Sequence, residues 1–63
     1  MYETIKKLCK EKNISVYELE KMAGLGNGTI RLWKDSSPRL ENLERVADAL
    51  GIKVTTLINR SKD

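Results

Sequence analysis

Residues that interrupt regular structure divide this chain into short segments, and this division constrains the fold more than any other feature. The interruptions leave no segment longer than about a dozen residues, and they fall at Asn13, Gly24, Gly26, Asn27, Gly28, Ser36–Ser37–Pro38 and Gly51. Between them the apolar residues recur at helical spacing, and no stretch alternates convincingly as a strand would. We therefore predict an all-α fold of five short helices.

The first two predicted helices have the clearest boundaries. The first runs from about residue 2 to 12, and its apolar face is formed by Ile5, Leu8 and Cys9, extended by Met1 or Tyr2. The second begins with Ser15 as N-cap and Glu18 three residues later, which is the spacing of a capping box. We expect it to end at Gly24 in the left-handed conformation, and its apolar face should contain Val16, Leu19, Met22 and Ala23.

The remaining three helices are predicted from apolar residues at helical spacing and from the residues that interrupt regular structure. The third spans 27 or 28 to about 35, with Ile30 and Trp33 as core anchors. The fourth starts at Ser37 with Pro38 in the first helical position and ends at Gly51, and its apolar face should contain Leu40, Leu43, Val46, Ala47 and Leu50. The fifth covers about 54–59 and offers Val54, Leu57 and Ile58, and a polar tail follows from about 60.

Length and composition exclude several classes of protein. A chain of 63 residues allows one domain, and it buries only about 60% of the surface of its unfolded form. There is no histidine and a single cysteine, Cys9. We therefore expect no disulfide within the chain, no metal site and no cofactor. With no activated nucleophile and no room for a substrate pocket, we expect no enzyme and no small-molecule substrate. The first residues do not resemble a signal peptide and apolar runs reach only two residues, so we predict a cytoplasmic protein without membrane contact.

The charge balance is basic. Lys and Arg number 12 against 9 Asp and Glu, which gives a net charge of +3 and a pI near 9.2. A basic pI in so small a domain is typical of nucleic-acid binding, although the same charge also serves solubility.

The stretch from Ser15 to Trp33 predicts a helix-turn-helix, because a capped helix is followed by a very short glycine-containing turn and a second short helix. Its residues Leu19, Ala23, Gly24, Leu25, Ile30 and Trp33 resemble the helix-turn-helix of lambda-type repressors and Cro, the XRE-like family. The spacing of Ser37–Pro38, Leu40, Leu43, Val46–Ala47, Leu50–Gly51–Ile52, Val54 and Leu57 resembles the last two helices of that family. The resemblance covers about residues 2–59. It implies a five-helix domain whose third helix reads the major groove of double-stranded DNA.

The helical wheel agrees with this implication. Ile30 and Trp33 define the buried side of the third segment, and the opposite side contains Gly28, Arg31, Leu32 and Asp35, flanked by Asn27 and Lys34. Together with the start of the second helix, this gives the candidate DNA-binding residues Ser15, Val16, Tyr17, Asn27, Gly28, Thr29, Arg31, Leu32 and Lys34.

Each candidate has a structural alternative. Ser15 and Asn27 could act only as helix caps, Gly28 could only ease the turn, and Thr29 could pack inward. Leu32 could contact a thymine methyl or pack against the 36–38 loop. Arg31 and Lys34 could be solvated, as could Lys6 and Lys10 on the first helix, and Asp35 could orient Arg31. For Trp33 and Cys9, burial in the core is favoured over a partner contact or reactivity.

Three positions depart from the family pattern. Glu20 stands where the family usually has alanine, so we expect either that its methylenes pack while its carboxylate escapes to solvent, or that the two helices cross at a slightly wider distance. Cys9 and Lys34 replace an arginine and a glutamate that commonly pair, so that pair is absent.

One recognition helix makes a small interface, so the resemblance implies a homodimer on a palindromic or near-palindromic site, with Leu57 and Ile58 as the candidate dimer surface or, alternatively, as part of the core. The same fold could instead serve as an antitoxin or another protein-interaction module.

Overall fold

The computed structural model describes residues 1–62, and these form four α-helices and one 3₁₀ helix without a strand. The α-helices are α1 (Tyr2–Glu11), α2 (Val16–Ala23), α3 (Leu40–Leu50) and α4 (Val54–Arg60). The 3₁₀ helix η1 (Ile30–Lys34) lies between α2 and α3. The prediction of an all-α fold is confirmed. The prediction of five helices is correct in number only if η1 is included.

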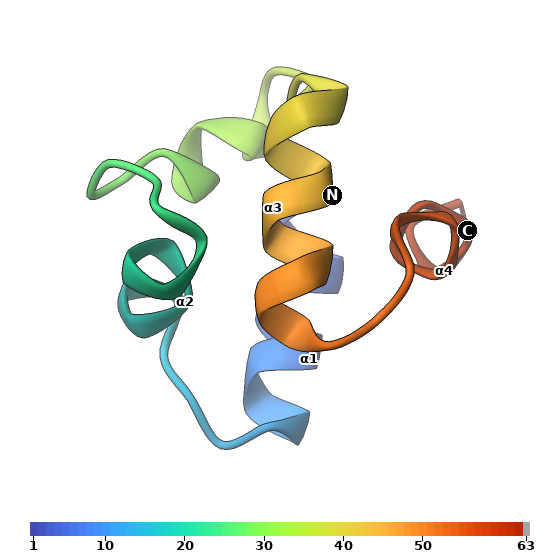
Figure 1. The fold of residues 1–63 in the computed structure, drawn as a ribbon. Coiled ribbons are helices and arrows are strands. Elements are labelled where there is room, and N and C mark those ends of the chain that lie inside the picture. The colour runs from blue at the N-terminus through green and yellow to red at the C-terminus, as the bar shows by residue number, and fades with distance from the viewer. Residues whose placement is uncertain (63) are drawn as a thin grey trace.

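Helix α3 lies at the centre of the molecule (Figure 1). It packs against α2 on one side and α4 on the other, while α1 contacts both α2 and η1. All five elements contribute to a single core, whose buried apolar residues are Ile5, Leu8, Cys9, Leu19, Ala23, Ile30, Trp33, Leu43, Val46, Ala47, Leu50 and Leu57. Burial raises the pKa of the Cys9 thiol, so Cys9 acts as a small core residue.

The ends of α2 are those that the sequence predicts. The Ser15 hydroxyl accepts the Glu18 N–H at 3.0 Å, and the Glu18 carboxylate accepts the Ser15 N–H at 3.0 Å, which completes the capping box. Gly24 ends the helix with φ +72°, a left-handed conformation that a side chain would strain.

The expected start of α3 is wrong by two residues. Arg39 is extended and acts as N-cap, and the first helical hydrogen bond runs from the Leu43 N–H to the Arg39 carbonyl at 3.0 Å. Leu40 therefore lies in the first turn, ahead of the core, and is 59% exposed rather than buried.

Met22 is a second exception to the predicted apolar faces, since it is 58% exposed. The buried residues of α2 are Leu19, Glu20 and Ala23. The buried face is therefore centred between the directions of Leu19 and Glu20, roughly 100° away from Met22 on the helical wheel. This rotation turns α2 toward the segment that follows it.

The C-terminal helix α4 is joined to the rest by packing and by one ion pair. Leu57 is fully buried, so it is a core residue and the expectation that it forms a dimer surface is wrong. Arg60 donates to both carboxylate oxygens of Glu11, at 2.9 and 3.4 Å, which connects the end of α4 to the end of α1. The Arg60 hydrogen bond lowers the pKa of the Glu11 carboxyl.

Candidate nucleic-acid interface

The third segment is shorter and more tightly wound than an α-helix. Gly28, with φ +89°, lies just before it, and it ends at Lys34, where the Asp35 N–H bonds back to the Leu32 carbonyl at 3.3 Å. The hydrogen bond from the Leu32 N–H to the Thr29 carbonyl, at 3.2 Å, has the three-residue spacing of a 3₁₀ helix. The N-cap is Thr29, so the alternative in which Asn27 acts only as the cap of this helix is excluded.

The orientation of η1 is the predicted one. Ile30 is fully buried and Trp33 nearly so. The outer side forms a shallow depression of about 510 Å³, lined by Gly28, Arg31, Leu32, Lys34, Asp35 and Ser36. Thus the residues that the helical wheel places opposite the core do lie outside, next to one another.

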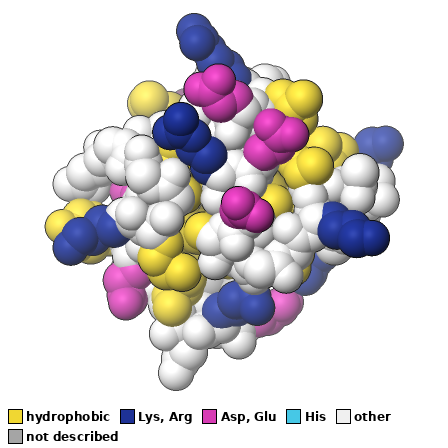
Figure 2. Space-filling view, in the orientation of Figure 1, with side chains coloured by type: hydrophobic (Ala, Val, Ile, Leu, Met, Phe, Trp, Pro, Cys, Tyr) yellow, Lys and Arg dark blue, Asp and Glu magenta, His cyan; other side chains and the backbone are white. Residues whose placement is uncertain are grey.

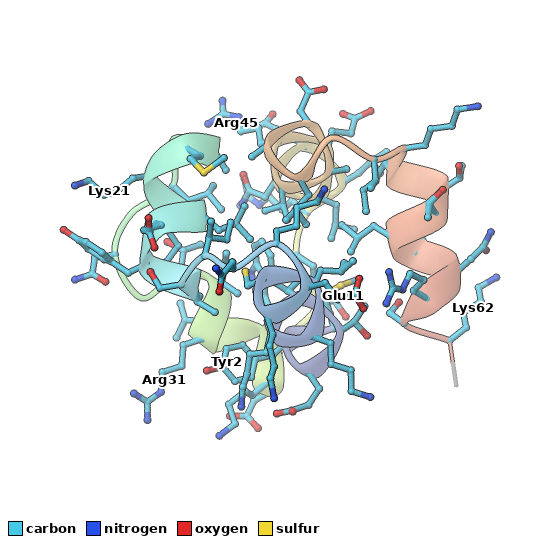
Figure 3. The ribbon with its side chains drawn as sticks, turned by 90° about the horizontal axis from the view of Figure 1, so that it is seen from below. Tyr2, Glu11, Lys21, Arg31, Arg45 and Lys62 are labelled. Atoms are coloured by element: carbon cyan, nitrogen blue, oxygen red, sulfur yellow. The ribbon has the colours of Figure 1, made fainter. Side chains whose placement is uncertain are left out.

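The 3₁₀ geometry changes which of these side chains are neighbours. Residues three apart eclipse each other in such a helix, so Arg31 is aligned with Lys34 along one edge. No ion pair between Arg31 and Asp35 is found among residues 1–62, and the suggested orientation of Arg31 by Asp35 is not supported. Arg31 instead points away from the body of the molecule (Figure 3).

Leu32 lies on the other edge and is 67% exposed. Its carbonyl oxygen accepts hydrogen bonds from the backbone N–H and the hydroxyl of Ser36, at 3.2 and 2.9 Å. The 36–38 loop is therefore connected to the Leu32 backbone and does not cover its side chain, which excludes the packing alternative.

The start of α2 provides polar groups beside this segment. The amides of Val16 and Tyr17 precede the first intrahelical hydrogen bond, from the Leu19 N–H to the Ser15 carbonyl. Ser15 and Tyr17 are exposed, whereas Val16 and Thr29 are half-buried. The Lys21 ammonium lies 5.1 Å from the centre of the Tyr17 ring, and Lys21 and Arg31 both point outward on the side away from α4 (Figure 3).

Tyr2 is a member of this surface that sequence reasoning missed. Its ring is approached by the ammonium groups of Lys6 at 5.3 Å and Lys34 at 5.9 Å, so it joins α1 to η1 through cation–π contacts. The pairing of Tyr2 with Lys6, four residues later on one helix, was a possible signal; the approach of Lys34 required the tertiary fold.

Glu20 is the second missed residue, and the prediction that its carboxylate escapes to solvent is wrong. The side chain is only 3% exposed. Its Oε1 accepts the Gly28 N–H at 3.1 Å, and its Oε2 accepts the Ile30 N–H at 2.9 Å. The carboxylate thus accepts hydrogen bonds from the backbone at the N-terminal end of η1, a capping role that was only an alternative for Asn27.

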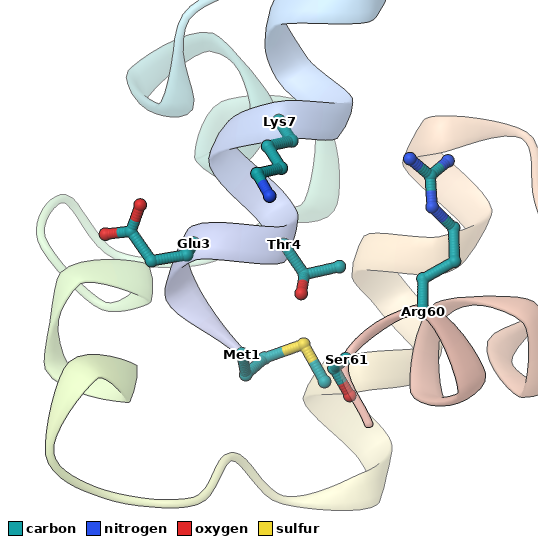
Figure 4. A pocket seen from close by; sticks show the side chains of 6 residues that line it. All are labelled: Met1, Glu3, Thr4, Lys7, Arg60 and Ser61. Carbon is teal, nitrogen blue, oxygen red and sulfur yellow. The ribbon is translucent and has the colours of Figure 1, made fainter. Parts of the chain in front are cut away.

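Charged side chains of both signs are spread over the surface of the molecule. Figure 2 shows acidic side chains over α3, and Lys and Arg side chains on every side of the same face. Four of the basic residues lie in η1 or in the helices beside it, namely Lys6 in α1, Lys21 in α2, and Arg31 and Lys34 in η1 itself. Another depression, of about 440 Å³, lies between the start of α1 and the end of α4 (Figure 4) and is lined by Met1, Glu3, Thr4, Lys7, Arg60 and Ser61, none of which belongs to α2 or η1.

The helix pair α2–η1, its short turn and its exposed outer face have the geometry of a helix-turn-helix. The sequence model of the Cro/C1-type HTH DNA-binding domain matches residues 4–63 of the chain. The chain belongs to this family. It is a DNA-binding protein of the Cro/C1 type, and the resemblance noted in the sequence is confirmed.

Comparisons with curated proteins and with solved structures gave no match. No helix among residues 1–62 is long and apolar enough to span a membrane. The same residues contain no group of three or more acidic or cysteine side chains placed to hold a metal ion.

Proposed function

We propose that this chain is a sequence-specific transcriptional regulator, a Cro- or repressor-like protein that binds its operator through residues 27–35. The observation that supports this most directly is the anchoring of η1. Ile30 and Trp33 fix one side in the core, and Arg31, Leu32 and Lys34 are exposed on the other. A short helix held in this way fits the major groove of B-DNA.

The side chains divide into two roles by their chemistry. Arg31 donates to guanine O6 and N7, Asn27 pairs with adenine, and Leu32 contacts a thymine methyl. Lys34, the Ser15 hydroxyl, the first amides of α2 at Val16 and Tyr17, and Thr29 bind phosphates and set the orientation of the domain. Gly28 lets the backbone approach the DNA closely, while its N–H is already bonded to Glu20.

The protein acts as a homodimer in this proposal. A single η1 offers few base contacts, and two copies related by a two-fold axis would read half-sites about one helical turn apart. Since Leu57 is buried, a dimer contact through α4 would use the half-buried Val54 and Ile58. The dimer would occupy a promoter in the cytoplasm and repress it by steric exclusion.

A binding selection from a random duplex pool tests this function. The purified chain is incubated with the pool at moderate salt, and bound duplexes are sequenced over several rounds. Enrichment of a palindromic or near-palindromic site would support a dimeric DNA reader, and the distance between half-sites would give the dimer geometry.

The opposite outcome is equally informative. If no sequence is enriched and binding is weak and lost with salt, the helix-turn-helix does not read bases. The fold would then serve as an antitoxin-type or other protein-interaction module, and a protein partner would have to be sought.

A further inference from the structure

Glu20 is the only charged residue buried among residues 1–62. It lies on α2, yet both of its hydrogen bonds go to the next element, to the backbone N–H groups of Gly28 and Ile30. The ion pairs within this part of the chain are Glu3–Lys6 and Glu11–Arg60, so the Glu20 carboxylate is compensated by amide groups and not by a cation.

The turn before η1 has few other backbone hydrogen bonds. The connection from α2 contains two left-handed glycines, Gly24 and Gly28. Within the turn, the Thr29 N–H donates to the Gly26 carbonyl at 3.2 Å. Ile30 and Trp33 fasten one side of η1 to the core. Both anchors are side chains on one side of η1, and the backbone amides of Gly28 and Ile30, at or just ahead of its start, are held by the Glu20 carboxylate.

We propose that Glu20 is a positioning residue that fixes the N-terminal end of η1 at the height and tilt needed to read bases, and that it thereby determines sequence specificity. This inference rests on the proposed function. Base-edge hydrogen bonds tolerate little displacement, whereas long lysine side chains reach phosphates from a range of positions. Loss of the Glu20 contacts should therefore reduce specific binding much more than nonspecific binding.

Glu20→Gln is the closest change that tests this role. It preserves the shape and volume of the side chain, but the amide has one acceptor oxygen and presents N–H donors to the second backbone N–H. Glu44→Gln is the matched control, since Glu44 is exposed on α3 and the substitution removes the same charge.

The experiment compares wild type, E20Q and E44Q by circular dichroism and by Kd, for the selected duplex and for a random duplex at one salt concentration. In E20Q we expect the affinity for the selected duplex, divided by the affinity for the random duplex, to fall about tenfold or more. One mismatched base pair has an effect of this size. Affinity for the random duplex should stay within about twofold of that of E44Q.

Two results in a folded E20Q would overturn the inference: an unchanged affinity ratio, or an equal loss of affinity for both duplexes. If E20Q does not fold, a synthetic chain with an ester in place of the Gly28 amide removes one donor and retains the carboxylate. The same fall in the ratio is expected there, and an unchanged ratio again overturns the inference.

The failure of the proposed function would look different. In that case wild type itself would select no sequence. Hydrogen exchange of wild type would still test the contacts. If the Gly28 and Ile30 amides exchange as fast as the amide of the exposed Asn27, the positioning role is overturned.

Discussion

Glu20 Oε2 lies 2.9 Å from the backbone nitrogen of Ile30, in a buried contact between residues ten positions apart. Together with the Gly28 contact, it satisfies two amides at the start of η1 that have no helical partner of their own. A buried donor that loses its acceptor costs roughly 1–3 kcal/mol. This contact therefore concerns folding as well as recognition.

Glu20→Ala is expected to lower the free energy of unfolding by about 2–4 kcal/mol, because it leaves the buried Ile30 amide without an acceptor, removes the part-buried Gly28 contact and leaves a small cavity. A domain of this size has about 3–5 kcal/mol to lose, so the variant should be largely unfolded at 37 °C. Urea unfolding followed by Trp33 fluorescence measures this, since Trp33 is the single tryptophan and is buried. Surface substitutions usually change the free energy of unfolding by less than about 0.5 kcal/mol, so a loss below that value would contradict this prediction.

The capping box gives a second prediction. Ser15→Ala removes the acceptor for the Glu18 N–H and should cost about 1 kcal/mol. Ser37→Ala is the control, because Ser37 is exposed and lies in the loop before α3. Equal urea midpoints for the two variants would show that the cap does not stabilise α2.

The contrast between Ser15 and Glu20 shows how far sequence reasoning reaches. The Ser15–Glu18 box and the left-handed Gly24 depend on neighbours within a few residues, so their spacing alone predicts them. The direction of Ile30 and Trp33 was equally predictable from periodicity. The burial of Glu20 depends on where a separate segment places its amides, and no local pattern encodes that.

The exposed apolar residues illustrate the same limit. Leu40 and Met22 fit the helical period, but they lie outside because α3 begins two residues late and α2 is rotated toward η1. Likewise, an α-helical wheel places both Lys34 and Asp35 about one turn from Arg31, whereas the 3₁₀ winding aligns Arg31 with Lys34.

Leu57→Ala tests whether Leu57 stabilises the core of a single chain or a contact between two chains. Leu57 is fully buried in the described fold, so truncation should cost about 2–5 kcal/mol. The unfolding midpoint should shift by the same amount at every protein concentration. Ile58→Ala, at a half-buried position, is the comparison. A loss for Leu57→Ala that disappears at high concentration would instead indicate a dimer contact.

The Glu11–Arg60 pair predicts a weak pH dependence. The Arg60 hydrogen bond lowers the pKa of Glu11 from its ordinary value of 4.5, so the folded state favours the ionised carboxylate. The stabilisation is present above pH 4.5 and is lost as the pH falls through the lowered pKa. Glu11→Gln should therefore reduce the melting temperature slightly at pH 7 and not at pH 2.

Both groups of the pair are exposed, so the effect should be small and should weaken in high salt. Thermal unfolding at the two pH values, with Glu44→Gln as control, measures it. A Glu11→Gln difference that persists unchanged at pH 2 would show that charge on Glu11 is not its cause.

Arg31 and Lys34 are aligned on η1, but the proposed roles predict different losses. Arg31→Ala should weaken binding to the selected duplex by about 1–3 kcal/mol and relax the preference at one base pair. Lys34→Ala should weaken all duplexes alike and reduce the slope of log K against log salt by about one. Lys53→Ala is the control for charge, because Lys53 is exposed at the start of α4, on the other side of α3 from η1 (Figure 1). If Arg31→Ala and Lys53→Ala lose the same affinity on every duplex, Arg31 contributes only charge, and the bases are read by other residues of the 27–35 segment.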